Sequence, residues 1–210
     1  MHDPIQILAQ VVALVLALTL HEFAHALMGH YLGDTTAKDK GRLTLNPLAH
    51  IDPFATLALP LFLIVVGSPV VFGAAKPVPF NPWAVRWGRW GAALVALAGP
   101  FTNLLLACFF ALCAQLLPFS SVGATFFAAL IIVNVGLFVF NMIPFPPLDG
   151  SRLLYAVAPP GLREVMDRIE QSGFVVLLAV MLLGYQFIAP WVAQATIAIV
   201  RLLVPASSVL

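Results

Sequence analysis

A run of almost entirely apolar residues, from Ile5 to Leu27, contains the sequence Leu20-His21-Glu22-Phe23-Ala24-His25 near its end. Histidines at positions i and i+4 of a helix lie on one face, close enough to bind the same metal ion. The glutamate between them projects beside the metal, where it can hold and deprotonate a metal-bound water. Because ionisable groups inside a membrane span are costly, the sequence predicts a functional metal site within a bilayer.

The composition supports a membrane location for the whole chain. Hydrophobic residues make up 61% of it and charged residues 9%, against about 25% charged in a typical soluble domain. This balance cannot cover a water-soluble surface, so we expect an integral membrane protein. The net charge of +1 gives no indication of a nucleic-acid partner. The 210 residues leave room for four to six spans, and we expect a single membrane-embedded domain over residues 1–210.

Three long spans can be placed from the apolar runs, at about 4–30, 92–117 and 123–143. The first has no Lys or Arg before Lys38, so we interpret it as a retained span and not as a secretory signal. The apolar stretch at about 172–204 contains Pro190, and it is either one span with a tail or two shorter spans.

The segments between the spans are of two kinds. Residues 57–73 are apolar but interrupted by prolines and a glycine, which makes them short for a complete span. Residues 42–45 alternate like a short strand, and the prolines of residues 76–82 favour an extended backbone. The predicted fold is therefore an all-α polytopic membrane protein, a bundle of about five transmembrane helices with a re-entrant segment and short extended strands on the cytosolic side.

The distribution of basic residues favours one topology. If residues 57–73 crossed the membrane, the basic cluster at 38–42 would lie opposite the cluster at 76–89. If they dip in and return, both clusters share a side with the basic loop at 152–168, and the uncharged turn at 118–122 lies opposite. Only the second arrangement follows the positive-inside tendency throughout. We therefore expect a re-entrant segment, an N-terminus outside, and basic loops in the cytosol.

A catalytic zinc takes three protein ligands and keeps one position open for water. The candidates for the third ligand are Asp149, His50, Asp52, His30 and Glu170. Asp149 stands out because Pro144-Phe145-Pro146-Pro147 ends the preceding span, and irregular backbone at membrane depth is tolerated where it lines a cavity. His50 and Asp52 fit cavity lining, a hydrogen bond to a ligating histidine, or loop capping equally. Asn103 and Asn134 are interpreted as bridges between spans.

With these motifs the sequence resembles the site-2 protease family of intramembrane zinc metalloproteases, in particular its small prokaryotic members. The resemblance covers roughly residues 15–155. It is carried by His21-Glu22-Phe23-Ala24-His25 and by the Asn-x-x-Pro-x-x-Pro-Leu-Asp-Gly pattern at 141–150, with further similarity at 41–47, 50–53, 72–79 and 97–103.

The resemblance implies a protease that hydrolyses peptide bonds within or near transmembrane helices of membrane protein substrates. His21, His25 and Asp149 would bind one Zn²⁺, and Glu22 would act as general base. Asn141 would help to hold the substrate carbonyl or its oxyanion. We expect the catalytic core over about 5–155, in a prokaryotic plasma membrane with the active site near the cytosolic side.

Larger members of this family carry a PDZ or a nucleotide-sensing domain, and these 210 residues have room for neither. The main alternative function is a non-catalytic membrane module that binds metal or a partner helix, and a metal transporter is a third. An intact Glu22 argues against the non-catalytic module, because metal binding alone does not need it. The ionisable residues are gathered at one depth, which argues against a metal transporter. The sequence identifies neither the substrate nor the oligomeric state.

Overall fold

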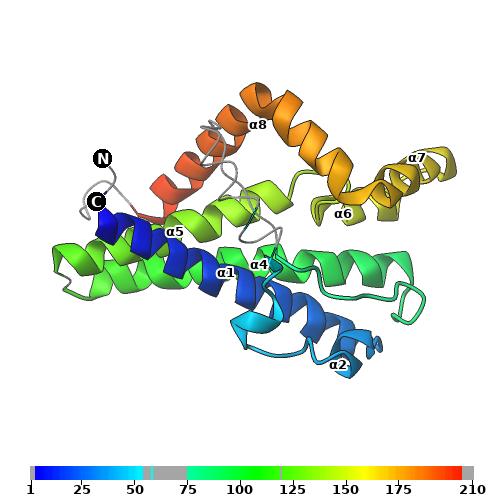
Figure 1. Cartoon of the computed structure of the whole chain (residues 1–210), viewed down its shortest axis with the longest axis horizontal. Coiled ribbons are helices and arrows are strands. Elements are labelled where there is room, and N and C mark those ends of the chain that lie inside the picture. The colour runs from blue at the N-terminus through cyan, green and yellow to red at the C-terminus, as the bar shows by residue number, and fades with distance from the viewer. Residues whose placement is uncertain (1–2, 54–57, 59–74, 119, 205–210) are drawn as a thin grey trace.

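The computed structural model describes residues 3–53, 58, 75–118 and 120–204. Within these ranges the chain forms seven α-helices and one 3₁₀ helix, and no β-strand. Four helical segments of this part are long and apolar enough to cross a membrane, namely Pro4–Tyr31, Arg89–Leu116, Ser121–Asn141 and Gln186–Leu203. The chain is therefore an integral membrane protein with an all-helical described fold, as the composition predicts (Figure 1).

Helix α1 (Pro4–Tyr31) forms where the sequence analysis places the first span. Pro4 occupies its first turn, where a missing N–H is tolerated, and the Asp3 carboxylate accepts the Ile5 N–H at 2.9 Å. Ala9, Ala13 and Ala17 follow one another along one face and are fully buried. Such small side chains allow neighbouring helices to approach closely, which is how helices pack in membranes.

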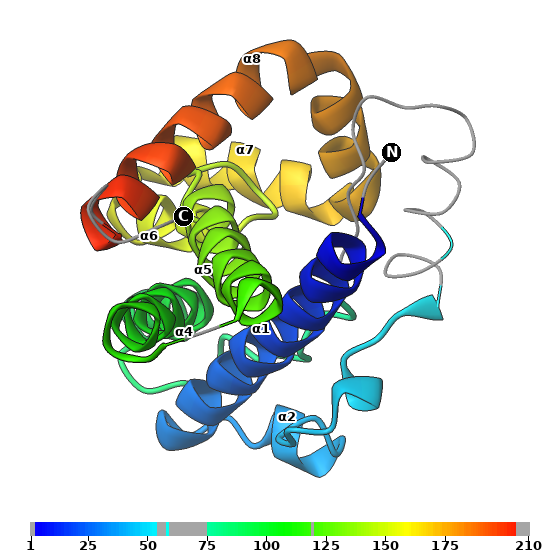
Figure 2. The ribbon, with the colours of Figure 1, turned by 90° about the vertical axis from the view of Figure 1, so that its left-hand side faces the viewer.

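Helices α1, α4 (Arg89–Leu116) and α5 (Ser121–Asn141) pack against one another and form the centre of the bundle (Figure 2). Chain direction alternates, so α1 and α5 run one way and α4 the other (Figure 1). Large side chains on the outer faces remain exposed, as expected for surfaces that contact lipid. They include Leu8, Val11, Leu105, Phe109 and Ile132.

The remaining helices extend this core. The short α6 (Gly150–Val157) packs on α4, and α7 (Pro160–Gln171) connects α6 to α8 (Gly173–Leu203). Helix α8 packs against α5, and Figure 1 shows it bent along its length. Pro190 lies inside α8 and cannot donate a backbone hydrogen bond there. The last apolar stretch is therefore one helix with a proline inside it, and not two separate helices.

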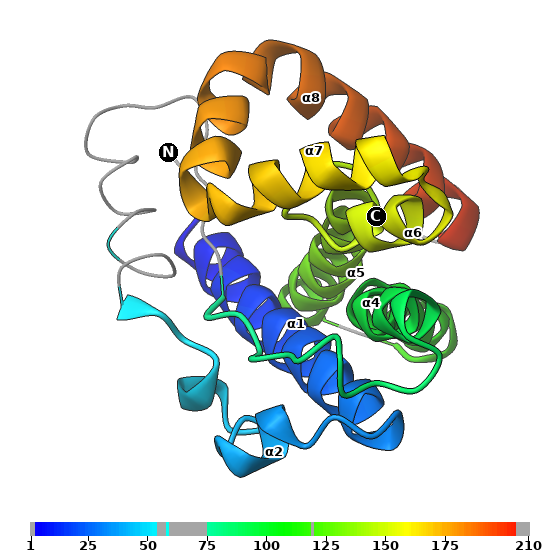
Figure 3. The ribbon, with the colours of Figure 1, turned by 90° about the vertical axis from the view of Figure 1, so that its right-hand side faces the viewer.

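Two polar segments, residues 34–50 and 76–86, meet at one end of the bundle (Figure 3). The first contains α2 (Thr36–Asp39) and the 3₁₀ helix η1 (Pro47–Ala49), and the second leads into α4. Backbone hydrogen bonds of 2.8 Å join Lys76 N–H to the His50 carbonyl and Arg86 N–H to the Leu32 carbonyl. The basic clusters at 38–42 and 76–89 therefore lie at the same end of the bundle.

The predicted strands are not confirmed. Residues 43–45 form bends, and backbone groups of Arg42 and Thr44 have local partners. Arg42 N–H bonds the Ala37 carbonyl at 2.8 Å, and His50 Nε2 donates to the Thr44 carbonyl at 2.9 Å. The segment at 76–82 is neither helix nor strand. The predicted re-entrant segment at 57–73 lies, apart from residue 58, outside the described residues, and a fifth span is not found among the rest.

Candidate metal centre

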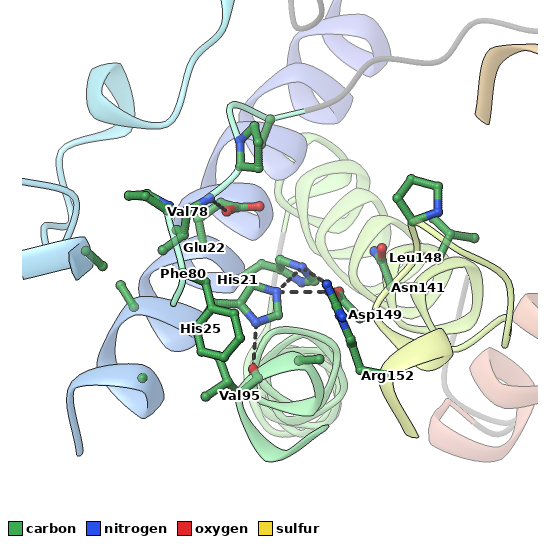
Figure 4. Close-up of a pocket in the computed structure, with 18 of the residues that line it drawn as sticks. His21, Glu22, His25, Val78, Phe80, Val95, Asn141, Leu148, Asp149 and Arg152 are labelled. Carbon is green, nitrogen blue, oxygen red and sulfur yellow. Dashed lines mark hydrogen bonds and ion pairs between the residues drawn. The ribbon is translucent and has the colours of Figure 1, made fainter. Parts of the chain in front are cut away.

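His21 and His25 lie one turn apart on the face of α1 that meets α4 and α5. His21 is 4% exposed, and its Nε2 atom lies 2.9 Å from Nε2 of His25 (Figure 4). The helical spacing of the motif therefore has the predicted consequence, because both imidazoles point to the same place. The point lies inside the bundle, away from the lipid-facing side chains.

Asp149 reaches the histidines because the chain turns back after α5. Pro144 to Pro147 cannot continue a helix, and the loop brings Gly150 against the end of α5. A Cβ on Gly150 would lie 2.4 Å from the Met142 carbonyl oxygen, so only glycine permits this approach. Asp149 Oδ2 thereby lies 3.2 Å from His21 Nε2 and 3.4 Å from His25 Nε2.

The spacing of these three atoms fits a tetrahedral zinc site. Ligand atoms about 2.0–2.1 Å from a tetrahedral centre lie about 3.3 Å from one another. The three observed separations are 2.9, 3.2 and 3.4 Å. Within the described residues, His21, His25 and Asp149 are also the one group of metal-ligating side chains close enough to share an ion.

The hydrogen bonds of the two imidazoles give a second, independent test of fit. His25 Nδ1 lies 2.8 Å from the Val95 carbonyl oxygen, and a carbonyl can only accept, so this nitrogen carries a proton. His21 Nδ1 lies 2.6 Å from Asn103 Oδ1 and donates to it. In the neutral imidazoles both Nε2 atoms are then lone-pair donors, and they face each other and a carboxylate oxygen. A cation bound between these lone pairs would stabilise the cluster, as in a metal site.

Gly99 of α4 makes room for the histidine pair. A Cβ at this position would lie 2.4 Å from His25 Nε2 and 2.7 Å from His21 Cε1. Both distances are far below van der Waals contact, and the imidazoles are fixed by their Nδ1 hydrogen bonds. This fold therefore requires glycine at position 99 for steric reasons, because any side chain there would displace a candidate ligand.

Glu22 points to the other wall of the site. Its side chain is 8% exposed, and its Oε2 atom accepts the Val78 N–H at 3.2 Å (Figure 4). Val78 belongs to the proline-rich segment (residues 76–82), which crosses α1 (Figure 3). Glu22 does not belong to the His21–His25–Asp149 group, as expected for a residue that flanks a metal without ligating it.

The proline-rich segment is held in place at both of its ends. At the first end, Lys76 N–H donates to the His50 carbonyl and the Lys76 carbonyl accepts Arg42 Nη2 at 2.5 Å. At the other, Asn81 N–H donates to Asp34 Oδ2 at 2.8 Å. These bonds anchor the backbone on both sides of Val78 and so set its position relative to Glu22.

Asp34 is suited to this anchoring because it stays charged. Burial by itself would raise the pKa of its carboxyl, but the N–H groups of Asn81 and Thr36 and the Thr36 hydroxyl hold that pKa below its ordinary value. A carboxylate accepts such bonds more strongly than a neutral acid. The anchor at Asn81 is therefore present at neutral pH and weakens when acid protonates Asp34.

A cavity of about 810 Å³ opens onto these groups. The histidines, Glu22 and Asp149 line it, together with the proline-rich segment and Asn141 of α5. Asn141 Nδ2 donates one N–H to the Leu137 carbonyl at 3.0 Å, which leaves its second N–H for an acceptor in the cavity. The cavity thus brings all five predicted site residues to one space.

The other candidate ligands take different places. Asp52 and Glu170 line the cavity outside the ligand group, and His30 and His50 do not belong to that group either. Asn103 bridges α4 and α5 through Asn134, as predicted. Its bond to His21 was not predicted, although its position four residues after Gly99 on α4 was a usable signal. The bond from Val78 to Glu22 left no sign in the sequence.

The steric argument at Gly99 gives a direct test. Gly99→Ala should lower zinc retention strongly, because the added methyl displaces two candidate ligands at once. The matched control is Gly136→Ala in α5, where a Cβ would meet nothing within 4 Å. Zinc content after purification and dialysis measures the effect. Equal zinc content in Gly99→Ala, Gly136→Ala and the wild type would contradict this metal centre.

Comparison with known proteins places the chain beside zinc metalloproteases. Residues 118–184 match the profile of Peptidase family M50. The chain is 42% identical over 177 residues to the Bacillus subtilis protein named "Putative zinc metalloprotease YwhC", which covers 80% of this chain and 77% of that protein. It is 34% identical over 171 residues to "Putative zinc metalloprotease Rip2" of Mycobacterium tuberculosis, covering 80% of this chain and 64% of that protein.

No solved structure matches the chain. The identity to YwhC over most of both chains nevertheless shows the family, and the all-helical membrane fold and the two-histidine, one-carboxylate cluster agree with it. The chain therefore belongs to peptidase family M50, the site-2 protease family of membrane zinc metalloproteases.

Proposed function

We propose that this protein hydrolyses peptide bonds within or near the transmembrane helices of membrane protein substrates, with His21, His25 and Asp149 as the ligands of one zinc ion. The observation that carries the proposal is the convergence of two imidazole Nε2 atoms and a carboxylate oxygen within 3.4 Å of one another. Burial in an apolar bundle makes that arrangement costly unless a cation occupies it.

Zinc bound there supplies a Lewis acid that polarises the scissile carbonyl and lowers the pKa of water. Glu22 is the group available for proton transfer. Its carboxylate takes a proton from the attacking water and passes it to the nitrogen of the leaving amine. Val78 N–H now occupies Oε2 of Glu22, which leaves the second carboxylate oxygen to accept that proton.

Asn141 is proposed to hold the substrate carbonyl, or the oxyanion that forms from it. It lines the cavity together with Asp149, eight residues further along the chain (Figure 4). One N–H of its amide is engaged by Leu137, so the other can donate to an oxygen in the cavity. Preorganised donors of this kind stabilise developing negative charge.

The proline-rich segment is the better candidate for binding an unwound substrate. Prolines at 77 and 79 lack N–H groups, so the donors of this stretch belong to the alternate residues 76, 78 and 80, of which Lys76 already donates to the His50 carbonyl. In an extended backbone, alternate residues direct these groups to the same side, and Val78 directs its N–H to Glu22. A substrate segment that pairs there would lie beside the proposed base. Residues 42–45 are less suitable, because they do not line the cavity, whereas residues 77–80 do.

We propose further that the site lies near the cytosolic face of a prokaryotic plasma membrane. Nine of the ten Lys and Arg residues lie in the segments at 38–42, 76–89 and 152–168, and the first two of these are hydrogen-bonded to each other. That clustering supports a cytosolic end under the positive-inside tendency. Helical rise puts His21 roughly 24 Å from the start of α1, a few ångströms inside a hydrocarbon layer about 30 Å thick.

In this proposal, residues 1–210 form a single protease domain with its core over about 5–155. A non-catalytic metal-binding module is not favoured. Pure metal binding leaves no role for a buried Glu22 beside the cluster, and the similar proteins are named as metalloproteases. Transmembrane proteins are the proposed substrates, and membrane lipid surrounds the exposed faces of the bundle.

The role of Glu22 can be tested by Glu22→Gln, which keeps size and hydrogen bonding but removes the base. We expect one zinc per chain to remain and cleavage to fall by about 10²–10⁴-fold. Proteomics of membrane fragments from cells with wild-type protein or Glu22→Gln would identify the uncleaved substrates, with Glu164→Gln on α7 as a matched control outside the cavity. Wild-type cleavage by Glu22→Gln with its zinc in place would show that this mechanism is wrong.

The proposed topology predicts the labelling of introduced cysteines. In a background without Cys108 and Cys113, cysteines in place of Lys40 and Arg86 should both react with an impermeant reagent from the cytosolic side only. A cysteine in place of Ser121, at the start of α5, should react from the opposite side. Labelling of positions 40 and 86 from different sides would contradict the arrangement.

A further inference from the structure

Asn103 is a fully buried polar residue in the middle of α4, with no exposed surface. It lies at the junction of three helices, because it contacts His21 and Ala17 of α1 and Asn134 of α5. A buried amide inside a membrane bundle is costly unless each of its polar groups has a partner. Its partners therefore indicate what the residue is for.

Every polar group of the Asn103 amide is engaged. Oδ1 lies 2.6 Å from His21 Nδ1, and Nδ2 donates to Asn134 Oδ1 at 2.9 Å and to the Ala17 carbonyl at 3.3 Å. Asn134, 1% exposed, in turn donates its Nδ2 to the Leu130 carbonyl at 2.8 Å. The bonds form one chain that runs from His21 through both asparagines to the backbone of α5.

The direction of this chain is fixed. A flipped Asn103 amide would turn its oxygen toward the Ala17 carbonyl and Asn134 Oδ1, and two acceptors facing an acceptor is unfavourable. Asn103 Oδ1 must therefore face His21, and the Nδ1 atom of His21 must be the donor. This leaves His21 Nε2 as the atom with a lone pair, and it is the atom that faces His25 and Asp149.

His25 does not need such a partner, since its Nδ1 donates to the backbone carbonyl of Val95. Only His21 depends on a side chain for the orientation of its ring. Without Asn103, the ring could rotate and could carry its proton on either nitrogen. Loss of a hydrogen-bond partner behind a ligating histidine typically costs about 10–100-fold in metal affinity.

We infer that Asn103 and Asn134 are positioning residues that hold the His21 ring with Nε2 toward the metal, so that the zinc site is completed only when α1, α4 and α5 are packed together. This inference rests on the proposed function, because it takes His21 as a zinc ligand. Neither asparagine touches the substrate or the metal in this arrangement.

The test is the zinc dissociation constant of the purified, zinc-stripped full-length protein, measured in detergent by competition with a chromophoric chelator. Asn103→Leu should raise this constant about 10–100-fold. Asn103→Asp, as a neutral acid, should stay close to the wild type, since one carboxyl oxygen can still accept from His21 Nδ1 and the carboxyl O–H can donate to Asn134 Oδ1. Gln115→Leu is the matched control, because it removes an amide of α4 that joins the Ala111 and Leu203 carbonyls far from the histidines.

A second pair of variants gives the answer independently if Asn103→Leu prevents folding. Asn134→Leu removes the acceptor of Asn103 Nδ2 and should weaken zinc binding, though less than Asn103→Leu, because the Ala17 carbonyl still holds the amide. Asn134→Asp keeps an acceptor and, as a neutral acid, a donor for the Leu130 carbonyl, so it should restore wild-type affinity. Rescue by the aspartates separates positioning from simple packing.

Wild-type zinc affinity in both leucine variants would overturn the inference, and so would equal losses in the leucine and aspartate variants at both positions. A failure of the proposed function would give different results. The wild-type protein would then bind no zinc, or His21→Ala would bind zinc as tightly as the wild type.

Discussion

The structure depends on the meeting, inside an apolar bundle, of three atoms that can each ligate a metal ion. Two imidazole nitrogens and a carboxylate oxygen lie within 3.4 Å of one another, and both imidazole protons are committed elsewhere, to Val95 and Asn103. In an apolar bundle such a group would be destabilising without a cation. The backbone devices around it serve to bring these atoms together.

Those devices are of three kinds. The helical spacing of α1 puts the two histidines on one face, and the glycines at 99 and 150 allow α4 and the loop before α6 to approach without a side chain between. The prolines after α5 end that helix so that Asp149 can turn back toward α1. Each is a local feature of the sequence, yet its consequence appears only when the helices pack.

The polar segments at one end of the bundle position Glu22 and not the histidines. Asp34 and Arg42 hold the proline-rich segment at its two ends, and this places the Val78 N–H on the Glu22 carboxylate. The proposed base is therefore positioned by backbone that is itself fixed by buried charges. Hydrogen bonds from α4 orient the two histidines, whereas the proline-rich segment orients Glu22. The candidate metal ligands and the proposed base are therefore positioned by different parts of the chain.

Much of this could be predicted from the sequence, because the signals are local. The bounds of α1, α4 and α5 follow from apolar runs with clear breaks, and the i, i+4 histidines follow from helical geometry. Asp149 needed the family resemblance, since spacing alone left four other candidates open.

What could not be predicted depends on packing between distant segments. The bond from Asn103 to His21 requires the rotation of α4 about its axis, which apolar periodicity does not fix when a helix is apolar on every side. Alternation predicts a strand at 42–45, but hydrogen bonds within the loop compete with strand pairing and occupy those groups. The segment at 57–73 falls, apart from residue 58, outside the described residues and stays a prediction.

X-ray absorption at the zinc K-edge of the purified wild-type protein tests the central claim most directly. The account predicts one zinc per chain with two imidazole nitrogens and oxygen ligands at about 2.0–2.2 Å, the oxygens coming from Asp149 and water. A single imidazole, or a sulfur ligand at about 2.3 Å from Cys108 or Cys113, would contradict this ligand set.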